Sequence, residues 1–180
     1  TYRLRADWSG GARPWQGQWR QLALFFGSDG ETGSVELLSV SVVPKGAVYA
    51  EAPHGVRPVT IGERIRRTLF THAPAGLSYR LRVPAGGRLD AALGVLHTED
   101  SVTFRIRVRA GREQTTIFEE RYADPEQWAQ RSADLSTFAG KTVTLTLESS
   151  ADQPGTVAFW GAPTVSGART SDKPNVIFYV

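Results

Sequence analysis

The stretch VTFRIRVR, residues 102–109, decides the fold class. Four apolar side chains at its even-numbered positions alternate with one threonine and three arginines at its odd-numbered positions. An alternation of period two is typical of an antiparallel β-strand with one buried and one solvated face. The same pattern recurs in residues 77–83, 88–95 and 142–147, so we expect the chain to be built from such strands.

Turn signals separate these stretches. Glycine, often with proline, occurs in residues 84–87, 110–111, 139–140 and 153–155. Many short strands at this spacing, without a long amphipathic helix, predict a β-sandwich or a barrel.

Further segments complete the expected order of elements. Residues 35–43 and 156–165 also have strand character, and GSDGETG, residues 27–33, is the strongest hairpin loop in the chain. Residues 128–133 are predicted to be extended. A one-turn helix is expected to begin at residues 134–136 and to end at Gly140.

The strand alternation also predicts core residues. We expect these to be Phe104, Ile106, Leu145, Leu147, Phe159 and Trp160. Phe159 and Trp160 are adjacent, so in a regular strand they face opposite ways. Both can be buried only if apolar material covers both faces of that strand.

Composition sets broad limits on function. The chain has 180 residues, of which 41% are hydrophobic and 22% are charged, which suits one globular domain or one domain with extra strands. A net charge of +3 is too small to indicate nucleic acid or a membrane surface as a partner. The chain contains no cysteine, which excludes disulfides, cysteine nucleophiles and cysteine-ligated zinc. No apolar run approaches the roughly 18 residues of a membrane helix.

From Leu77 to Gly167 the order of features becomes specific. A strand is followed by VPAGGRLDAALGVL, VTFRIRV, a tryptophan with ADLSTFAGKTVTLTL, and VAFWGAPTV. This order resembles the galactose-binding-like jelly roll of many carbohydrate-binding modules, and more narrowly the accessory domain ahead of the catalytic domain in some bacterial sulfatases. The resemblance is carried by Trp128, Asp134, Leu135, Gly140, Trp160, Gly161 and Pro163. It implies an all-β fold, a jelly-roll β-sandwich, over residues 49–168.

The final stretch KPNVIFYV, residues 173–180, is similar to the first core strand of the sulfatase and alkaline phosphatase superfamily. Residues 169–180 are therefore expected to be a linker and the first strand of a downstream sulfatase-like catalytic domain. No C-x-P-x-R or S-x-P-x-R nucleophile motif is present, so this chain is expected to be non-catalytic, with no cofactor. Residues 1–48 are expected either to add strands to the sandwich or to be the tail of a preceding module.

Two classes of tryptophan are expected. Trp128 and Trp160 lie beside apolar strand residues and are expected to pack in the core. Trp8 and Trp15, like Trp19, lie among glycines and polar residues such as Arg13. These aromatic rings either anchor a loop or stack on sugar rings, with Arg13 donating hydrogen bonds to hydroxyls. The candidate carbohydrate-binding residues are therefore Trp8, Arg13 and Trp15.

Two arginine clusters have two interpretations each. Arg105, Arg107 and Arg109 share one face of a strand, which is either a solvated outer face or a groove for sulfated or uronic glycans. The same alternatives apply to residues 64–67, which include Arg64, Arg66 and Arg67.

The remaining polar groups give weaker signals. Ser28, Asp29, Glu31 and Thr32 match no dedicated calcium loop and favour a plain hairpin tip over a metal site. His54, His72 and His97 are dispersed, so no metal and no catalysis is assigned to them. The acid pairs 99–100 and 119–120 are adjacent in sequence, which sends their side chains to opposite faces of a strand and argues against a catalytic carboxylate pair.

The sequence thus predicts a non-catalytic accessory module of a larger, exported bacterial sulfatase-like enzyme, in the periplasm or outside the cell. Its expected partners are a glycan, neutral or anionic, and the catalytic domain downstream in the same chain, with no nucleic acid and no membrane span. The alternative is a structural spacer or interaction domain without a sugar ligand.

Overall fold

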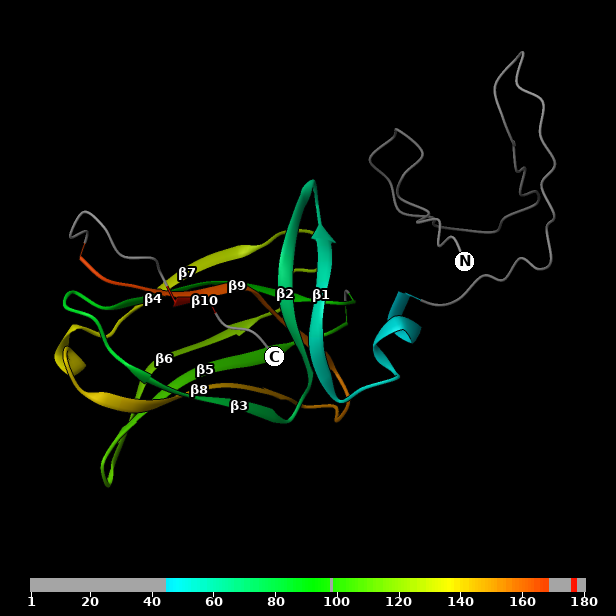
Figure 1. The fold of residues 1–180 in the computed structure, drawn as a ribbon. Helices are drawn as coiled ribbons and strands as arrows, with labels where there is room; N and C mark the ends of the chain where they lie inside the picture. The colour runs from blue at the N-terminus through cyan, green and yellow to red at the C-terminus, as the bar shows by residue number, and fades with distance from the viewer. Residues whose placement is uncertain (1–44, 98, 169–175, 178–180) are drawn as a thin grey trace, which may run out of the picture. The chain divides into compact units, whose positions relative to one another are not determined.

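The computed structural model describes residues 45–97, 99–168 and 176–177. The strand predicted at residues 35–43 and the hairpin loop at residues 27–33 lie outside these residues. The described unit begins at Lys45 and contains two antiparallel sheets stacked face to face (Figure 1).

Strand order defines the two sheets. In the first sheet the order is β1 (His54–Ile61), β2 (Arg64–His72), β9 (Val157–Ser166), β4 (Arg88–Val95) and β7 (Ala129–Asp134), with β10 (Val176–Ile177) also paired to β9. In the second sheet it is β3 (Ala75–Arg82), β8 (Thr142–Ala151), β5 (Val102–Ala110) and β6 (Glu113–Tyr122). Two short 3₁₀ helices, η2 (Lys45–Tyr49) and η3 (Ser136–Phe138), complete the described elements.

This order is a jelly roll. Strands β2, β9, β4 and β7 face β3, β8, β5 and β6. The hairpins within one sheet are β1–β2 in the first sheet and β5–β6 in the second. Every other connection from β2 to β9 crosses to the opposite sheet, as two interlocked Greek keys require. The all-β jelly-roll β-sandwich predicted from the sequence is confirmed, as are the extended segment before Asp134 and the short helix before Gly140.

The main core lies between the sheets. Phe104, Ile106, Leu145 and Leu147 are at most 3% exposed, as the strand alternation predicted. Trp160 is fully buried among them, and its ring meets the Phe104 ring edge-on at 5.0 Å between centroids. Aromatic pairs in this geometry add to the stabilisation that comes from burying their area.

A second apolar cluster covers the outer side of the first sheet. Phe159 belongs to it, while its neighbour Trp160 points into the main core. Tyr49 of η2 packs on Phe70 and Phe159 with ring centroids 5.0 and 5.2 Å apart. The two adjacent aromatic residues are therefore both buried because apolar material lies on both sides of β9.

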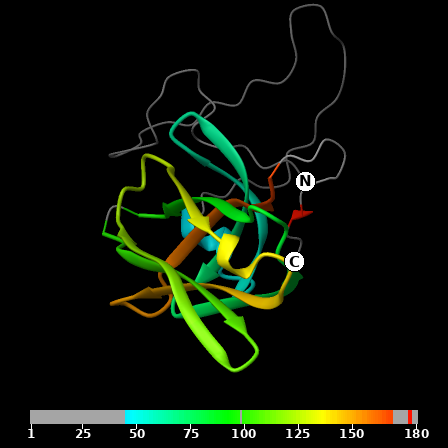
Figure 2. The ribbon, with the colours of Figure 1, turned by 90° about the vertical axis from the view of Figure 1, so that its left-hand side faces the viewer.

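The sheet ends differ in how far they project. In both ribbon views the β5–β6 hairpin extends beyond the rest of the second sheet, with Gly111 at its tip in a left-handed conformation of φ 65° (Figures 1 and 2).

Val176 and Ile177 pair with Val165 and Thr164 of β9. No helix in the described parts of the chain is both long and apolar enough to cross a membrane.

Candidate functional site

The outer side of the second sheet is a polar surface, which we call the open face. Its residues alternate along each strand with the buried residues of the main core, and the cross-strand register places them side by side. They are Gly76, Ser78, Arg80 and Arg82 of β3, Thr142, Thr144, Thr146, Glu148 and Ser150 of β8, Thr103, Arg105, Arg107 and Arg109 of β5, and Gln114, Thr116, Glu119 and Arg121 of β6.

The register arranges the open face in rows across the strands. Ser78, Thr146 and Arg107 form one row, in which the two hydroxyl oxygens lie 2.9 Å apart. Directly opposite residues in an antiparallel sheet have Cα atoms about 4.5–5.5 Å apart. Hydroxyl and guanidinium groups therefore follow one another at intervals of about one strand spacing.

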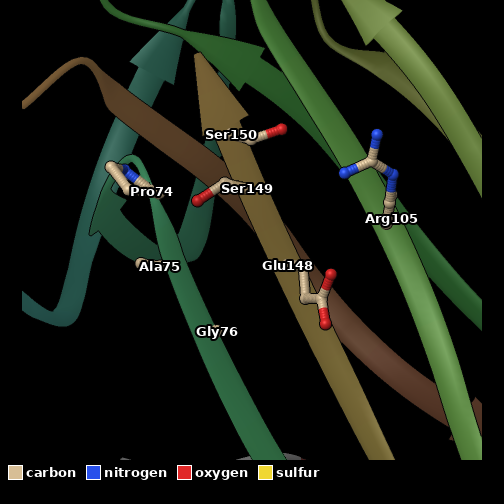
Figure 3. Close-up of a pocket in the computed structure, with 7 residues that line it drawn as sticks. All are labelled: Pro74, Ala75, Gly76, Arg105, Glu148, Ser149 and Ser150. Atoms are coloured by element: carbon tan, nitrogen blue, oxygen red, sulfur yellow. The ribbon is translucent and has the colours of Figure 1, made fainter. Parts of the chain in front are cut away.

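A shallow hollow of about 350 Å³ opens on this face (Figure 3). It lies between the start of β3, the end of β8 and Arg105 of β5, and Glu148 is among its lining residues. Gly76 stands directly opposite Glu148, so the strand has no side chain where the hollow forms. A Cβ atom at Gly76 would lie 3.5 Å from Cγ2 of Thr146 and 3.6 Å from Cγ of Glu148, which are ordinary contacts. The backbone therefore leaves room here for a side chain or a ligand.

Ion pairs engage Arg105, which lines the hollow, and its neighbour Arg107 on the open face. Nη2 of Arg105 donates a hydrogen bond to Oε1 of Glu119 at 3.1 Å, and Nε of Arg105 forms an ion pair with Oε2 at 2.8 Å. This hydrogen-bonded pairing lowers the pKa of the Glu119 carboxyl and raises the pKa of the Arg105 guanidinium. Nε of Arg107 lies 3.2 Å from Oε2 of Glu148. The two charged residues that line the hollow, Arg105 and Glu148, therefore each have an ion-pair partner.

The predicted carbohydrate-binding residues Trp8, Arg13 and Trp15 lie outside the described residues, as do Ser28, Asp29, Glu31 and Thr32. The structure places Arg105, Arg107 and Arg109 together on the open face, as their alternation predicted. The second arginine cluster, Arg64, Arg66 and Arg67, lies on β2 of the other sheet.

Arg64 and Arg66 lie on β2 of the first sheet, beside Trp128. The Trp128 indole donates a hydrogen bond to the Arg64 carbonyl at 2.9 Å, and the Arg66 guanidinium carbon is 5.8 Å from the ring centroid. Trp128 packs against the second apolar cluster. Its predicted packing role is confirmed, although it remains only partly buried.

The histidines and paired acids are not brought together. His72 spans two backbone carbonyls, of Tyr49 and Gly155, while His54 and His97 are exposed. Glu119 pairs with Arg105, whereas Glu120 pairs with Arg131 of the other sheet. In the described parts of the chain, no three His, Cys, Asp or Glu residues are placed to hold a metal ion.

Sequence reasoning missed part of the open face. Gly76, Ser78 and Arg80 of β3 and the threonines of β8 face the same side as the β5 arginines. The alternation in residues 77–83 and 142–147 contained the signal, because each stretch separates apolar from polar positions. That the two stretches are neighbouring strands is shown only by the strand order β3-β8-β5 of the folded sheet.

No protein-family model matches this chain, and no curated protein matches it. Among solved structures, TmCBM61 in complex with β-1,4-galactotriose is 14% identical, with 57% of this chain and 71% of that chain covered at a TM-score of 0.44. The CBM22-1 xylan-binding domain of Paenibacillus barcinonensis Xyn10C is 14% identical, with 64% and 84% covered at 0.43. The C-terminal family 22 carbohydrate-binding module of Clostridium thermocellum Xyn10B is 10% identical, with 68% and 86% covered at 0.44. Because these TM-scores are all below 0.5, we assign the jelly roll from the strand order alone.

Proposed function

We propose that this chain is a non-catalytic carbohydrate-binding module whose ligand lies across the open face and enters the hollow beside Gly76. The observation that carries the proposal is the hollow itself. It is a solvent-open space on a sheet face that no other described element covers, beside a glycine that has no side chain, and it is lined by Arg105, Glu148 and Ser150.

The chemistry of the face suits a polyhydroxylated ligand. Hydroxyl groups such as those of Ser78 and Thr146 both donate and accept hydrogen bonds, and Arg105 and Glu148 add charged donors and acceptors. Among the outward residues of the described sheet there is no aromatic ring, so hydrogen bonds rather than stacking would hold the sugar. A few exposed hydrogen bonds, offset by the entropy of association, give dissociation constants on the order of millimolar to micromolar.

A second location for the ligand stays a prediction. Trp8 and Trp15 offer rings for stacking on sugars, and Arg13 offers hydrogen-bond donors. All three lie outside the described residues. Substitutions at the two locations separate them. Gly76→Val fills the hollow with a residue that strands favour, whereas Trp8→Ala and Trp15→Ala remove the proposed stacking rings.

The experiment is calorimetry on the full chain with β-1,4-galactotriose, xylohexaose and oligosaccharides of dextran and dextran sulfate, supported by a glycan array. We expect at least one ligand to bind, Gly76→Val to weaken that binding at least about fivefold, and the two tryptophan variants to bind normally. Normal binding by Gly76→Val together with loss in Trp8→Ala or Trp15→Ala would move the site to the N-terminal segment and overturn the open-face proposal.

A structural spacer domain is the second candidate function. It is favoured by the absence of an aromatic platform on the open face and by the internal ion pairs of Arg105 and Arg107. A solvated antiparallel sheet often carries such polar residues without any ligand. The absence of binding to every glycan on the array would establish the spacer and end the carbohydrate-binding proposal.

We further propose that the module belongs to an exported, periplasmic or extracellular bacterial protein and precedes a sulfatase-like catalytic domain. Support comes from the resemblance of residues 77–167 and of the stretch KPNVIFYV. The test is the natural gene beyond Val180. We expect an Asp within a few residues and a C/S-x-P-x-R motif further on, and a gene without them contradicts the sulfatase-like parent.

A further inference from the structure

Six arginines project from the open face, against two glutamates. Four of the six have a fixed partner. These are Arg105 with Glu119, Arg107 with Glu148, Arg121 with Asp152 at 2.9 Å, and Arg82, which donates to the Gly140 carbonyl at 3.2 Å. Most of the positive charge on this face is therefore already engaged.

The other two arginines, Arg80 and Arg109, have no hydrogen-bond or ion-pair partner among the described residues, and both are exposed. They are not scattered. Arg80 of β3 and Arg109 of β5 are each directly opposite Thr144 of β8, so the three residues form one row. With about 4.5–5.5 Å between neighbouring Cα atoms, the two arginines start roughly 10 Å apart, on either side of one hydroxyl.

We infer that Arg80, Thr144 and Arg109 form an anion subsite that takes the sulfate or carboxylate group of an acidic glycan. A guanidinium presents several N–H donors in a planar fork that matches the oxygens of such groups, and the Thr144 hydroxyl supplies one more donor from below. Two long side chains that flank a short one can close over an anion above the short one. This inference rests on the proposed carbohydrate binding and names its ligand class.

The subsite and the hollow lie on the same three strands, β3, β8 and β5. Along β8, Thr144 and Glu148 are four residues apart and face the same way. At about 3.4 Å per residue, the anion subsite lies roughly 14 Å from the hollow. A chain of a few sugar units can reach both, with an acidic group at Thr144 and a neutral unit beside Gly76.

The experiment compares matched charged and neutral ligands on the full chain. Dissociation constants are measured for oligosaccharides of dextran and dextran sulfate, which share a backbone, and for an oligogalacturonate, with inorganic sulfate as competitor. Variants are Arg80→Ala, Arg109→Ala, the double variant with both of these substitutions, Arg80→Lys and Thr144→Val. The control is Arg64→Ala, which removes the same charge from an exposed strand position of the other sheet. Thermal unfolding checks that each variant is folded.

We expect Arg80→Ala and Arg109→Ala each to weaken binding of the acidic ligands by roughly five- to tenfold and to leave neutral ligands unchanged. The double variant should lose less than the product of the two single losses, because both side chains hold one group. Arg80→Lys should restore binding only in part, and Thr144→Val should cause a smaller loss. Dextran sulfate and oligogalacturonate show which of the two anionic groups is preferred.

Three results overturn the subsite. One is an equal loss in Arg64→Ala, which means a general charge effect, and another is full additivity in the double variant. The third is unchanged binding of acidic ligands in Arg80→Ala and Arg109→Ala while Gly76→Val still abolishes binding of a neutral ligand. In that case the proposed carbohydrate binding stands and only the subsite fails. If no glycan of either kind binds, the proposed function itself fails.

Discussion

The two outer faces of the sandwich differ in polarity and in what packs against them. The outer side of the first sheet, here called the covered face, carries Phe70, Phe159 and Leu96 and is packed under η2 and Trp128. The open face of the second sheet carries hydroxyls and charges, and no other element in the described parts of the chain lies over it. Glycine shows the contrast at single positions. A Cβ at Gly94 of the covered face would lie 2.6 Å from Cδ1 of Ile61, whereas a Cβ at Gly76 of the open face would make only ordinary contacts. One face uses glycine to pack closely and the other leaves a space.

The largest expected effect is on stability, from emptying the second apolar cluster. Phe159→Ala removes a ring that is 1% exposed and packs against Tyr49 and Trp128. We expect the free energy of unfolding to fall by about 3–5 kcal/mol. Thr142→Ala on the open face serves as the control and should change it by no more than about 0.5 kcal/mol. Equal losses in urea unfolding would show that the two faces do not differ as described.

The glycine pair sharpens the comparison with one added methyl group on each face. Gly94→Ala must displace Ile61 or the Trp128 ring, where Cζ3 would be 2.8 Å away, and we expect a cost of about 1–3 kcal/mol. Gly76→Ala meets no such obstacle and should be neutral or stabilising by up to about 1 kcal/mol, because alanine loses less backbone freedom than glycine. Chemical denaturation of both variants is the measurement. A costly Gly76→Ala would mean that the hollow is not open space.

The strands that could be predicted from the sequence are those with one wet side. In β5 and β8 the apolar and polar positions alternate, because one face meets the main core and the other meets solvent. The adjacent aromatic residues Phe159 and Trp160 also predicted that apolar material covers both sides of one strand. The jelly roll followed from the order of these features.

Two strands, β2 and β6, could not be predicted from the sequence, each for a physical reason. In β2, residues 68–71 are all buried, because the core lies on one side and the second cluster on the other, so no alternation remains. In β6 most residues are exposed at the edge of the sheet, so selection for burial leaves little pattern. The row of Arg80, Thr144 and Arg109 depends on pairing between residues far apart in sequence. Spacing along the chain does not contain that information.

A smaller effect is expected where the two sheets meet at their edges. Arg131 of β7 donates to both carboxylate oxygens of Glu120 of β6, which ties the first sheet to the second. A double-mutant cycle of Arg131→Met and Glu120→Gln should give a coupling energy of about 0.5–1 kcal/mol. The exposed pair of Arg88 and Asp90 lies within one strand, and its cycle should give a value near zero. Coupling as weak in the first pair as in the second would remove its role as a link between the sheets.

The smallest expected effect is the acid titration of the open face. Because Arg105 holds the pKa of Glu119 below its ordinary value, Glu119 binds its proton more readily in the unfolded chain than in the folded one. Its contribution to stability is therefore present above the unfolded pKa and is lost as the pH falls through the lower folded pKa. We expect NMR titration of the Glu119 carboxyl to show the lowered pKa, and Arg105→Ala to return it toward the ordinary value. An unchanged pKa in that variant would show that the pair does not hold the charge.

The most direct test of the central claim, that the open face binds carbohydrate, is chemical-shift mapping on the ¹⁵N-labelled chain. β-1,4-Galactotriose, xylohexaose and a dextran sulfate oligosaccharide are titrated in turn while backbone amide signals are followed. We predict that at least one ligand shifts the amides of β3, β8 and β5, centred on Gly76 and Thr146, and leaves those around Gly94 and Trp128 in place. Shifts confined to residues 1–44 or to the covered face, or no shifts with any of the three ligands, would contradict the account.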